Sequence, residues 1–252
     1  MKCGVLCDDG CTDGVLSYSM PQGDHRDADV DLRDFTYDGH VTDHYLSGGL
    51  GQLTDGVEGH SNFRLDPDGW GRKGYEWVGW RNNSVQGVTT SSDSVLILFR
   101  FDQRRRFTGI RLHANNMFTR GVRVFRRAVI RVMGDDADSD LVSTSTPGPV
   151  ERRVVVYDHR RDRLIDFARN VVITLPDLVG SLVSVQLFFD ATWMLVSEVR
   201  FESGAPLACS LWRNQGGRGG GKGLIPQSSR QNISIPINCT KFANLVCLFS
   251  EK

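Results

Sequence analysis

Residues 95–101 read VLILFRF, a run of aliphatic, β-branched and aromatic side chains with a single Arg at position 100, which is typical of a buried strand. Residues 110–114, Ile-Arg-Leu-His-Ala, follow a basic triplet at 104–106 and alternate apolar with polar side chains. This alternation indicates a strand with one buried face. We therefore expect the two segments to form a β-hairpin, and a polar strand position such as His113 to lie at the surface.

More segments of the same kind continue along the chain. Turn residues separate them, and no convincing amphipathic helix pattern interrupts them. The predicted strands are 122–124, 128–133, 154–157, 171–175, 183–189 and 193–201. Such a series predicts an all-β fold, an antiparallel β-sandwich or jelly roll. The long glycine-rich loops between residues 38 and 76 are the expected place for function.

Composition and charge limit the classes of function. The chain has 252 residues, and its 30 Lys and Arg balance its 30 Asp and Glu, so the formal net charge is zero. This balance lacks the overall basic charge of a nucleic-acid-binding protein, and we expect no nucleic-acid partner. No apolar run is long enough for a membrane helix, and the first residues lack the apolar segment of a signal peptide.

The chain divides into three zones. Residues 1–11 form a short cysteine-rich stub, residues 12–203 have an even strand-like texture, and residues 204–252 form a Gly/Ser-rich tail that we expect to be disordered. All six cysteines lie near the two ends, at positions 3, 7, 11, 209, 239 and 247. The central domain must therefore be held together by burial rather than by disulfides.

Several short motifs have an ordinary explanation that we prefer to a functional one. Residues 216–222 have the spacing of a phosphate-binding loop, but Gly223 stands where Ser or Thr is needed. The acidic residues at 135–140 lack the Gly and Glu that a helix–loop–helix calcium loop requires. The three cysteines of the stub are spaced more widely than in most zinc sites. The histidines form no Ser/His/Asp or Cys/His set, so we assign no catalytic residue.

Residues 48–57, Gly-Gly-Leu-Gly-Gln-Leu-Thr-Asp-Gly-Val, are more informative. Glycine lets the backbone fold tightly, so carbonyl oxygens can converge. Ca²⁺ takes about six to eight oxygen ligands from carboxylates, amides and carbonyls. On its own, this segment is compatible with a structural turn or with part of a calcium site.

Five motifs in a fixed order together resemble one known family. They are Tyr37-Asp38-Gly39-His40, residues 48–57, Tyr75-Glu76-Trp77-Val78-Gly79-Trp80-Arg81-Asn82, His113-Ala114-Asn115-Asn116-Met117-Phe118 and Trp193-Met194-Leu195-Val196-Ser197-Glu198. They look like the second, discoidin-like domain of the discoidin domain receptors, which are collagen-activated receptor tyrosine kinases. The resemblance covers residues 11–203 and suggests a fragment of the invertebrate type.

The resemblance implies an eight-stranded jelly roll of the galactose-binding-like type, which carries bound calcium and packs against the preceding discoidin domain. The calcium ligands that it implies are Gln52, Asp55, Val57, Tyr75, Trp77, Ser197 and Glu198. Trp77 replaces a Tyr of the vertebrate pattern, which is harmless if the ligand is a backbone oxygen. Arg33 stands where that pattern has a glycosylated Asn near the metal, so its cation is unfavourable unless the side chain points away.

Two further features follow from the resemblance. Asn82, which opens the sequon Asn82-Asn83-Ser84, matches a glycosylation position of the family. The family's disulfide would join the positions of Ala114 and Val185, which both fall on apolar faces of predicted strands. We expect this small apolar pair to replace the bridge, at a cost of about 2–5 kcal/mol of stability unless packing compensates.

The expected function is that of one receptor part. The family binds collagen through the first discoidin domain, and that domain, the transmembrane helix and the kinase are missing from this chain. We therefore expect a non-enzymatic, calcium-stabilised structural and signalling-support module on the extracellular side of the plasma membrane, within a receptor dimer. Collagen would be reached only through the missing domain. The alternative is a stand-alone lectin-like or phospholipid-binding discoidin module.

Overall fold

The computed structural model describes residues 14–67, 69, 71–82, 84, 93–134 and 154–204. The cysteine-rich stub at 1–11, the acidic residues at 135–140 and the tail from 205 onward lie outside these ranges. The interpretations given for those three segments, including the domain boundaries, therefore stay predictions.

Nearly all regular structure in the described residues is β. The two helical elements there are short 3₁₀ turns, η1 (Gln52–Thr54) and η2 (Phe118–Arg120). The strands are β1 (Val15–Pro21), β2 (His25–Arg26), β3 (Val30–Asp31), β4 (His40–Thr42), β5 (Tyr45–Gly49), β6 (Val78–Arg81), β7 (Ser94–Ala114), β8 (Arg127–Met133), β9 (Val154–Asp158), β10 (Arg169–Phe188) and β11 (Trp193–Ser203). The prediction of an all-β antiparallel sandwich is confirmed.

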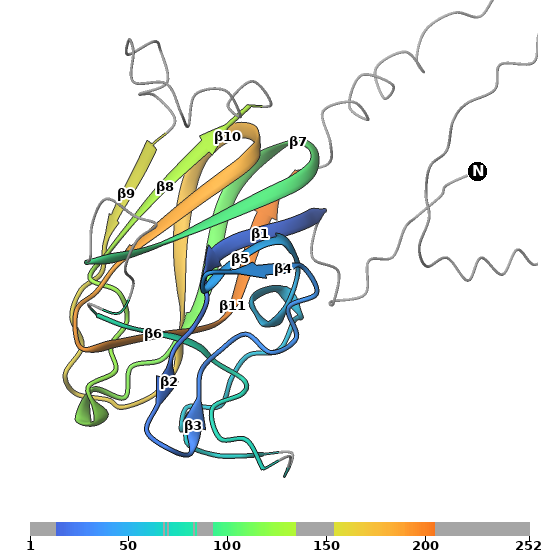
Figure 1. Cartoon of the computed structure of the whole chain (residues 1–252). Coiled ribbons are helices and arrows are strands. Elements are labelled where there is room, and N and C mark those ends of the chain that lie inside the picture. Colours follow the sequence, from blue (N-terminus) through green and yellow to red (C-terminus); the bar gives the residue numbers. More distant parts are fainter. Residues whose placement is uncertain are drawn as a thin grey trace, which may run out of the picture. The chain divides into compact units, whose positions relative to one another are not determined.

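Two long curved strands, β7 and β10, run side by side through the domain (Figure 1). They pair antiparallel over their whole length, from Ser94 opposite Phe188 to Ala114 opposite Arg169. The predicted hairpin is wrong, because the basic triplet at 104–106 lies within β7. The two segments pair with β10 and not with each other, and the register with β10 shifts at the bend, where β7 folds over into the other layer (Figure 1).

Two other strand predictions also change. The segments 171–175 and 183–189 are parts of the single strand β10. The predicted strand at 122–124 is wrong, because Val122 makes only an isolated parallel bridge to Trp193. Its neighbour Arg123 donates a backbone hydrogen bond to the carbonyl of Trp193 at 3.1 Å, but no ladder continues from there.

The sheet order explains how two layers arise. The strands follow the order β4-β5-β1-β7-β10-β8-β9, and β11 pairs with both β7 and β6. β1 pairs with the first part of β7, where Tyr18 lies opposite Phe99, and β11 pairs with the last part, where Val199 lies opposite Leu112. Because β7 bends between these partners, one ladder of hydrogen bonds serves both layers. This sheet has nine strands rather than the eight of the expected jelly roll, and β2 and β3 form a separate pair.

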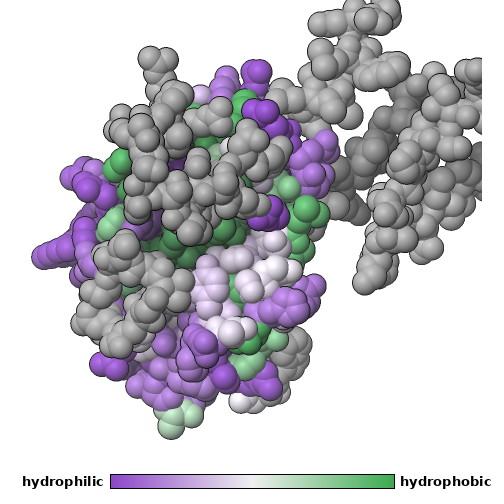
Figure 2. Space-filling model, turned by 45° about the horizontal axis from the view of Figure 1, so that its top comes forward, coloured by the Kyte–Doolittle hydropathy of each residue, from purple (hydrophilic) through white to green (hydrophobic). Residues whose placement is uncertain are grey.

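Aromatic side chains dominate the core near the bend of β7. The rings of Phe99 and Phe201 are 4.9 Å apart, and those of Phe101 and Phe107 are 4.7 Å apart, both edge to face. Ala114 and Val185 are fully buried in the same hydrophobic cluster, which fits an apolar pair, although the replacement of a disulfide stays a prediction. Figure 2 shows many hydrophilic side chains on the described surface, with hydrophobic ones among them.

Candidate metal centre

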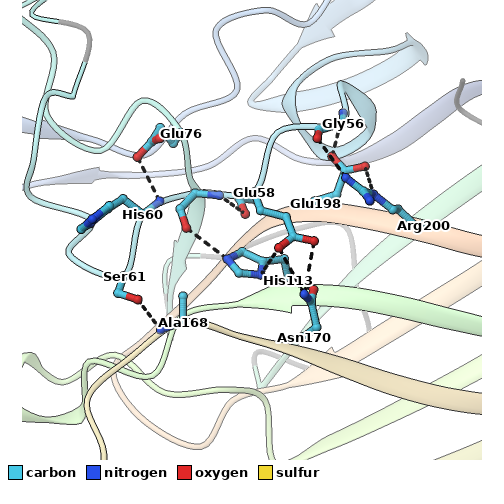
Figure 3. A network of polar contacts seen from close by, with 12 residues as sticks. Gly56, Glu58, His60, Ser61, Glu76, His113, Ala168, Asn170, Glu198 and Arg200 are labelled. Atoms are coloured by element: carbon cyan, nitrogen blue, oxygen red, sulfur yellow. Dashed lines mark hydrogen bonds and ion pairs between the residues drawn. The ribbon is translucent and has the colours of Figure 1, made fainter. Parts of the chain in front are cut away.

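Three segments that are distant in the sequence meet beside β11 (Figure 3). The first is the loop after η1, the second is the turn before β6, and the third is Ser197–Glu198. The amide of Gly56 donates to Glu198 Oε2 at 3.1 Å, and the amide of Gly59 donates to Ser197 Oγ at 2.9 Å. The register of β11 with β7 shifts between Val196 and Glu198, next to these contacts. Irregularities of this kind re-aim side chains at functional sites.

Trp77 joins the second segment to the first. Its side chain is fully buried, and its indole Nε1 donates to the carbonyl of His60 at 3.2 Å. The ring stacks on His113, with centroids 5.4 Å apart. A Cβ at Gly59 would lie 2.5 Å from Cε2 of Trp77, so only glycine fits under this ring. Close packing against Trp77 therefore requires a glycine at position 59 of the loop.

One buried carboxylate, that of Glu198, lies at the centre of the arrangement, and the more exposed Asp55 is near enough to influence it. Glu198 is only 4 % exposed, and burial raises the pKa of its carboxyl to about 7, with a further contribution from the nearby Asp55. The amide of Gly56 and the guanidinium of Arg200 oppose this rise. Burial also raises the pKa of Asp55. Two ionised carboxylates in such a place favour a bound cation.

The other implied ligands have the following surroundings. Gln52 is buried, and its side-chain Oε1 accepts the amide of Phe35 at 3.0 Å. Val57 is exposed, and its amide donates to Asp55 Oδ1 at 2.8 Å. Tyr75 lies in the turn that leads into Trp77. The loop after η1 contacts β11 through Gly56, whereas the side chain of Gln52 is already engaged with the backbone of Phe35.

Arg33 and Asn82 lie outside this arrangement of contacts. The guanidinium of Arg33 pairs with Asp31, with Nη2 to Oδ2 at 2.8 Å, so its charge is matched by that carboxylate. Asn82 follows β6 and is half-buried, and its amide donates to the carbonyl of Thr192 at 2.8 Å. Glycosylation of Asn82 stays a prediction.

A second polar group lies next to the first and was not predicted. His113 is 7 % exposed, so the expectation of a surface histidine is wrong: the loop at Gly59 and the ring of Trp77 cover it. Its Nε2 lies 3.1 Å from the carbonyl of Gly59, and its Nδ1 faces Glu58 Oε2 at 3.4 Å. Asn170 on β10 also contacts Glu58, at 3.1 Å (Figure 3). Alternation along the strand could not reveal this cover, because it comes from a distant loop.

The chemistry of the available donors fits a hard cation. The implied ligand set offers carboxylate, amide, hydroxyl and backbone oxygens, and Ca²⁺ prefers such ligands. Within the part of the chain that the structure describes, no three His, Cys, Asp or Glu side chains are grouped as a metal cluster. Zinc, which binds through several nitrogen or sulfur ligands, has no such set there. The residues that would hold calcium are those of the three converging segments.

The described residues thus form an antiparallel β-sandwich with polar groups gathered on its loops. Residues 14–203 match a family model described as "Discoidin domain-containing receptor 1/2, DS-like domain". The chain therefore belongs to this family, and it is a discoidin-like domain of the discoidin domain receptors.

The curated relatives agree with this assignment. "Epithelial discoidin domain-containing receptor 1" of Homo sapiens is 33 % identical over 205 residues, covering 77 % of this chain and 20 % of the relative. "Discoidin domain-containing receptor tyrosine kinase B" of Caenorhabditis elegans is 27 % identical over 201 residues, covering 77 % and 22 %. The chain thus spans about a fifth of the length of these relatives, and the matched part is the discoidin-like domain.

Solved structures that align with this chain are more distant. A fucose-binding module of Streptococcus pneumoniae aligns with a TM-score of 0.34 and 12 % identity, over 60 % of this chain and 82 % of that one. The C-terminal domain of a chitobiase from Bacteroides fragilis aligns with a TM-score of 0.38 and 8 % identity, over 78 % and 98 %. No helix in the described residues has the length and apolar character needed to cross a membrane.

Proposed function

We propose that this chain is the second extracellular domain of a collagen-activated receptor tyrosine kinase, and that bound calcium stabilises it as a structural and signalling-support module. The family match and the receptor names of the relatives support the receptor context. Collagen binding and phosphorylation would belong to other parts of such a receptor. The partners would be the preceding discoidin domain and, through receptor dimerisation, a second receptor chain.

The observation that carries the calcium proposal is that the loop after η1 lies against Glu198: the amide of Gly56 donates to Glu198 Oε2 at 3.1 Å, and Asp55 is near enough to raise the pKa of the Glu198 carboxyl further. Two carboxylates that are raised in pKa by burial, beside a tight backbone loop, form a site that gains from a divalent cation. Ligands would come from Gln52, Asp55, Val57, Tyr75, Trp77, Ser197 and Glu198. The metal would join the loop after η1 to β11 and so fix the long loop on the sandwich.

Thermal unfolding with and without a chelator tests this proposal. A ligand present at about 100 times its dissociation constant stabilises the folded state by about 2.7 kcal/mol, which shifts the Tm of a domain this size by about 5–10 °C. We expect this shift with calcium and a much smaller one with magnesium. Glu198→Gln should abolish most of it. An unchanged Tm on adding calcium would contradict the site.

A second measurement tests the division of roles in the receptor. Because the collagen-binding function is proposed to lie in another domain, residues 11–203 alone should not retain collagen in a solid-phase assay. The glycan-binding alternative can be examined with the same material on a glycan array. Tight and saturable collagen binding by this domain alone would refute the proposed role.

A further inference from the structure

Arg200 reaches into the candidate metal centre from the same strand as Glu198. The two residues are separated by one position on β11 and so lie on the same face. The Nη2 atom of Arg200 donates to the carbonyl of Gly56 at 2.9 Å, and its Nε donates to Glu198 Oε1 at 3.4 Å (Figure 3). One guanidinium thus binds a carboxylate from β11 and a backbone oxygen from the loop after η1.

These contacts form a closed ring with the amide of Gly56. Its N–H donates to Oε2 of Glu198, while its carbonyl accepts from Arg200, which itself holds Oε1 of Glu198. Both carboxylate oxygens of Glu198 are therefore engaged on the side where the loop meets β11. The guanidinium of Arg200 thus links an oxygen atom of the loop to an oxygen atom of β11, which is also what a bound metal ion would do.

The two partners differ in their freedom to move. The side chain of Glu198 is 5 % exposed, whereas that of Arg200 is 40 % exposed. Arginine also has a long aliphatic stem that can extend along a surface and keep its charge in water. Arg200 can therefore leave the contact without unfolding β11, but Glu198 cannot. An arginine that can leave while its carboxylate partner stays in place can be exchanged for another cation.

We propose that Arg200 is an internal cation that competes with calcium for Glu198 and determines the calcium affinity of the domain. This inference rests on the calcium site proposed above. When no metal is bound, Arg200 holds the loop on β11 through Gly56 and Glu198. When calcium binds Glu198, the repulsion between the two cations drives the guanidinium into solvent. The domain then depends less on calcium for its fold, and it binds calcium more weakly, than it would without this arginine.

Isothermal titration calorimetry with calcium chloride tests the competition on the whole chain. Arg200→Gln removes the competing charge, and we expect the calcium dissociation constant to fall by about tenfold. In chelator, the same variant should have a lower Tm than the wild type, because the loop loses its internal clamp. Arg200→Lys keeps the charge without the forked contact and should have an intermediate affinity.

Arg111→Gln is the matched control. Arg111 lies opposite Arg200 in the pairing of β7 with β11, and among the described residues it makes no ion pair. The variant removes the same charge next to the site and should change the dissociation constant by less than about twofold. If the wild type and the Arg200→Gln variant bind calcium equally, the competition is refuted and the metal site remains. If neither protein binds calcium, both proposals are overturned.

Discussion

Gly59→Ala is expected to destabilise the domain by about 3–5 kcal/mol, although it adds a single methyl group. The added Cβ would lie 2.5 Å from Cε2 and 2.6 Å from Nε1 of Trp77. That ring cannot retreat, because it is fully buried and stacks on His113. The backbone of Gly59 must therefore move away from both Trp77 and β11.

The magnitude follows from the contacts that this movement breaks. Overpacking of a well-filled site costs about 1–3 kcal/mol. The amide of Gly59 donates to Ser197 Oγ at 2.9 Å, and its carbonyl lies 3.1 Å from Nε2 of His113. Each weakened hydrogen bond adds about 1 kcal/mol. Because no positive φ is involved at Gly59, the whole effect is steric and not conformational strain.

Urea denaturation in chelator measures this cost without a contribution from metal. Gly204→Ala is the matched control, since its Cβ would meet nothing closer than the carbonyl of Arg106 at 3.9 Å, and it should change stability by less than about 0.5 kcal/mol. In a Trp77→Phe background, Gly59→Ala should cost at least about 1 kcal/mol less, because the nearest ring atoms are gone. Equal stability of the Gly59→Ala variant and the wild type would refute the packing argument.

Three other expectations follow from single contacts. The folded pKa of Glu198 is raised from 4.5 to about 7, so in chelator stability should fall as pH rises from about 4.5 to about 7, and Glu198→Gln should flatten this part of the profile. Tyr18→Phe removes the hydroxyl that donates to the buried Asp34, and a loss of about 1–3 kcal/mol in thermal unfolding is expected; no change in Tm would sink this reasoning. The turn between β4 and β5 holds Asp43 and His44 at φ 48° and 61°, so replacing the pair by Asn-Gly should stabilise the domain by about 1 kcal/mol, and a lower Tm would contradict the assigned turn.

Local pattern was enough to place most strands, and the reason lies in their burial. Val183, Val185 and Leu187 on β10 alternate with more polar neighbours, and as expected they are buried in the hydrophobic core of the sandwich. Pattern could not reveal that 95–101 and 110–114 belong to one strand. That continuity depends on pairing with β10, which lies far away in the sequence. The basic triplet at 104–106 contains no Gly or Pro to reverse the chain, so nothing in it specifies a hairpin turn.

Only part of the candidate site can be predicted from the sequence. Asp55 and Glu198 came from the family resemblance, because their separation along the chain gives no local signal. Arg200 could have been found from the sequence, since a residue two positions after Glu198 on a strand shares its face. The burial of His113 could not be predicted from the sequence, because the residues that cover it, Gly59 and Trp77, belong to other segments.

The bend of β7 also sets how the domain responds to mechanical load. The carbonyl of Gly14, where the described domain begins, accepts the amide of Asp102, and the amide of Gly204, where it ends, donates to the carbonyl of Arg106. Both attachment points thus flank the same bend. Tension along the polypeptide would therefore peel β1 and β11 from β7 one bond at a time, starting at this corner, rather than shear them together. Glu198 lies on β11. Force applied at the carboxyl end of the domain would therefore detach Glu198 from the candidate site before it separated the strands at the opposite end of the sandwich.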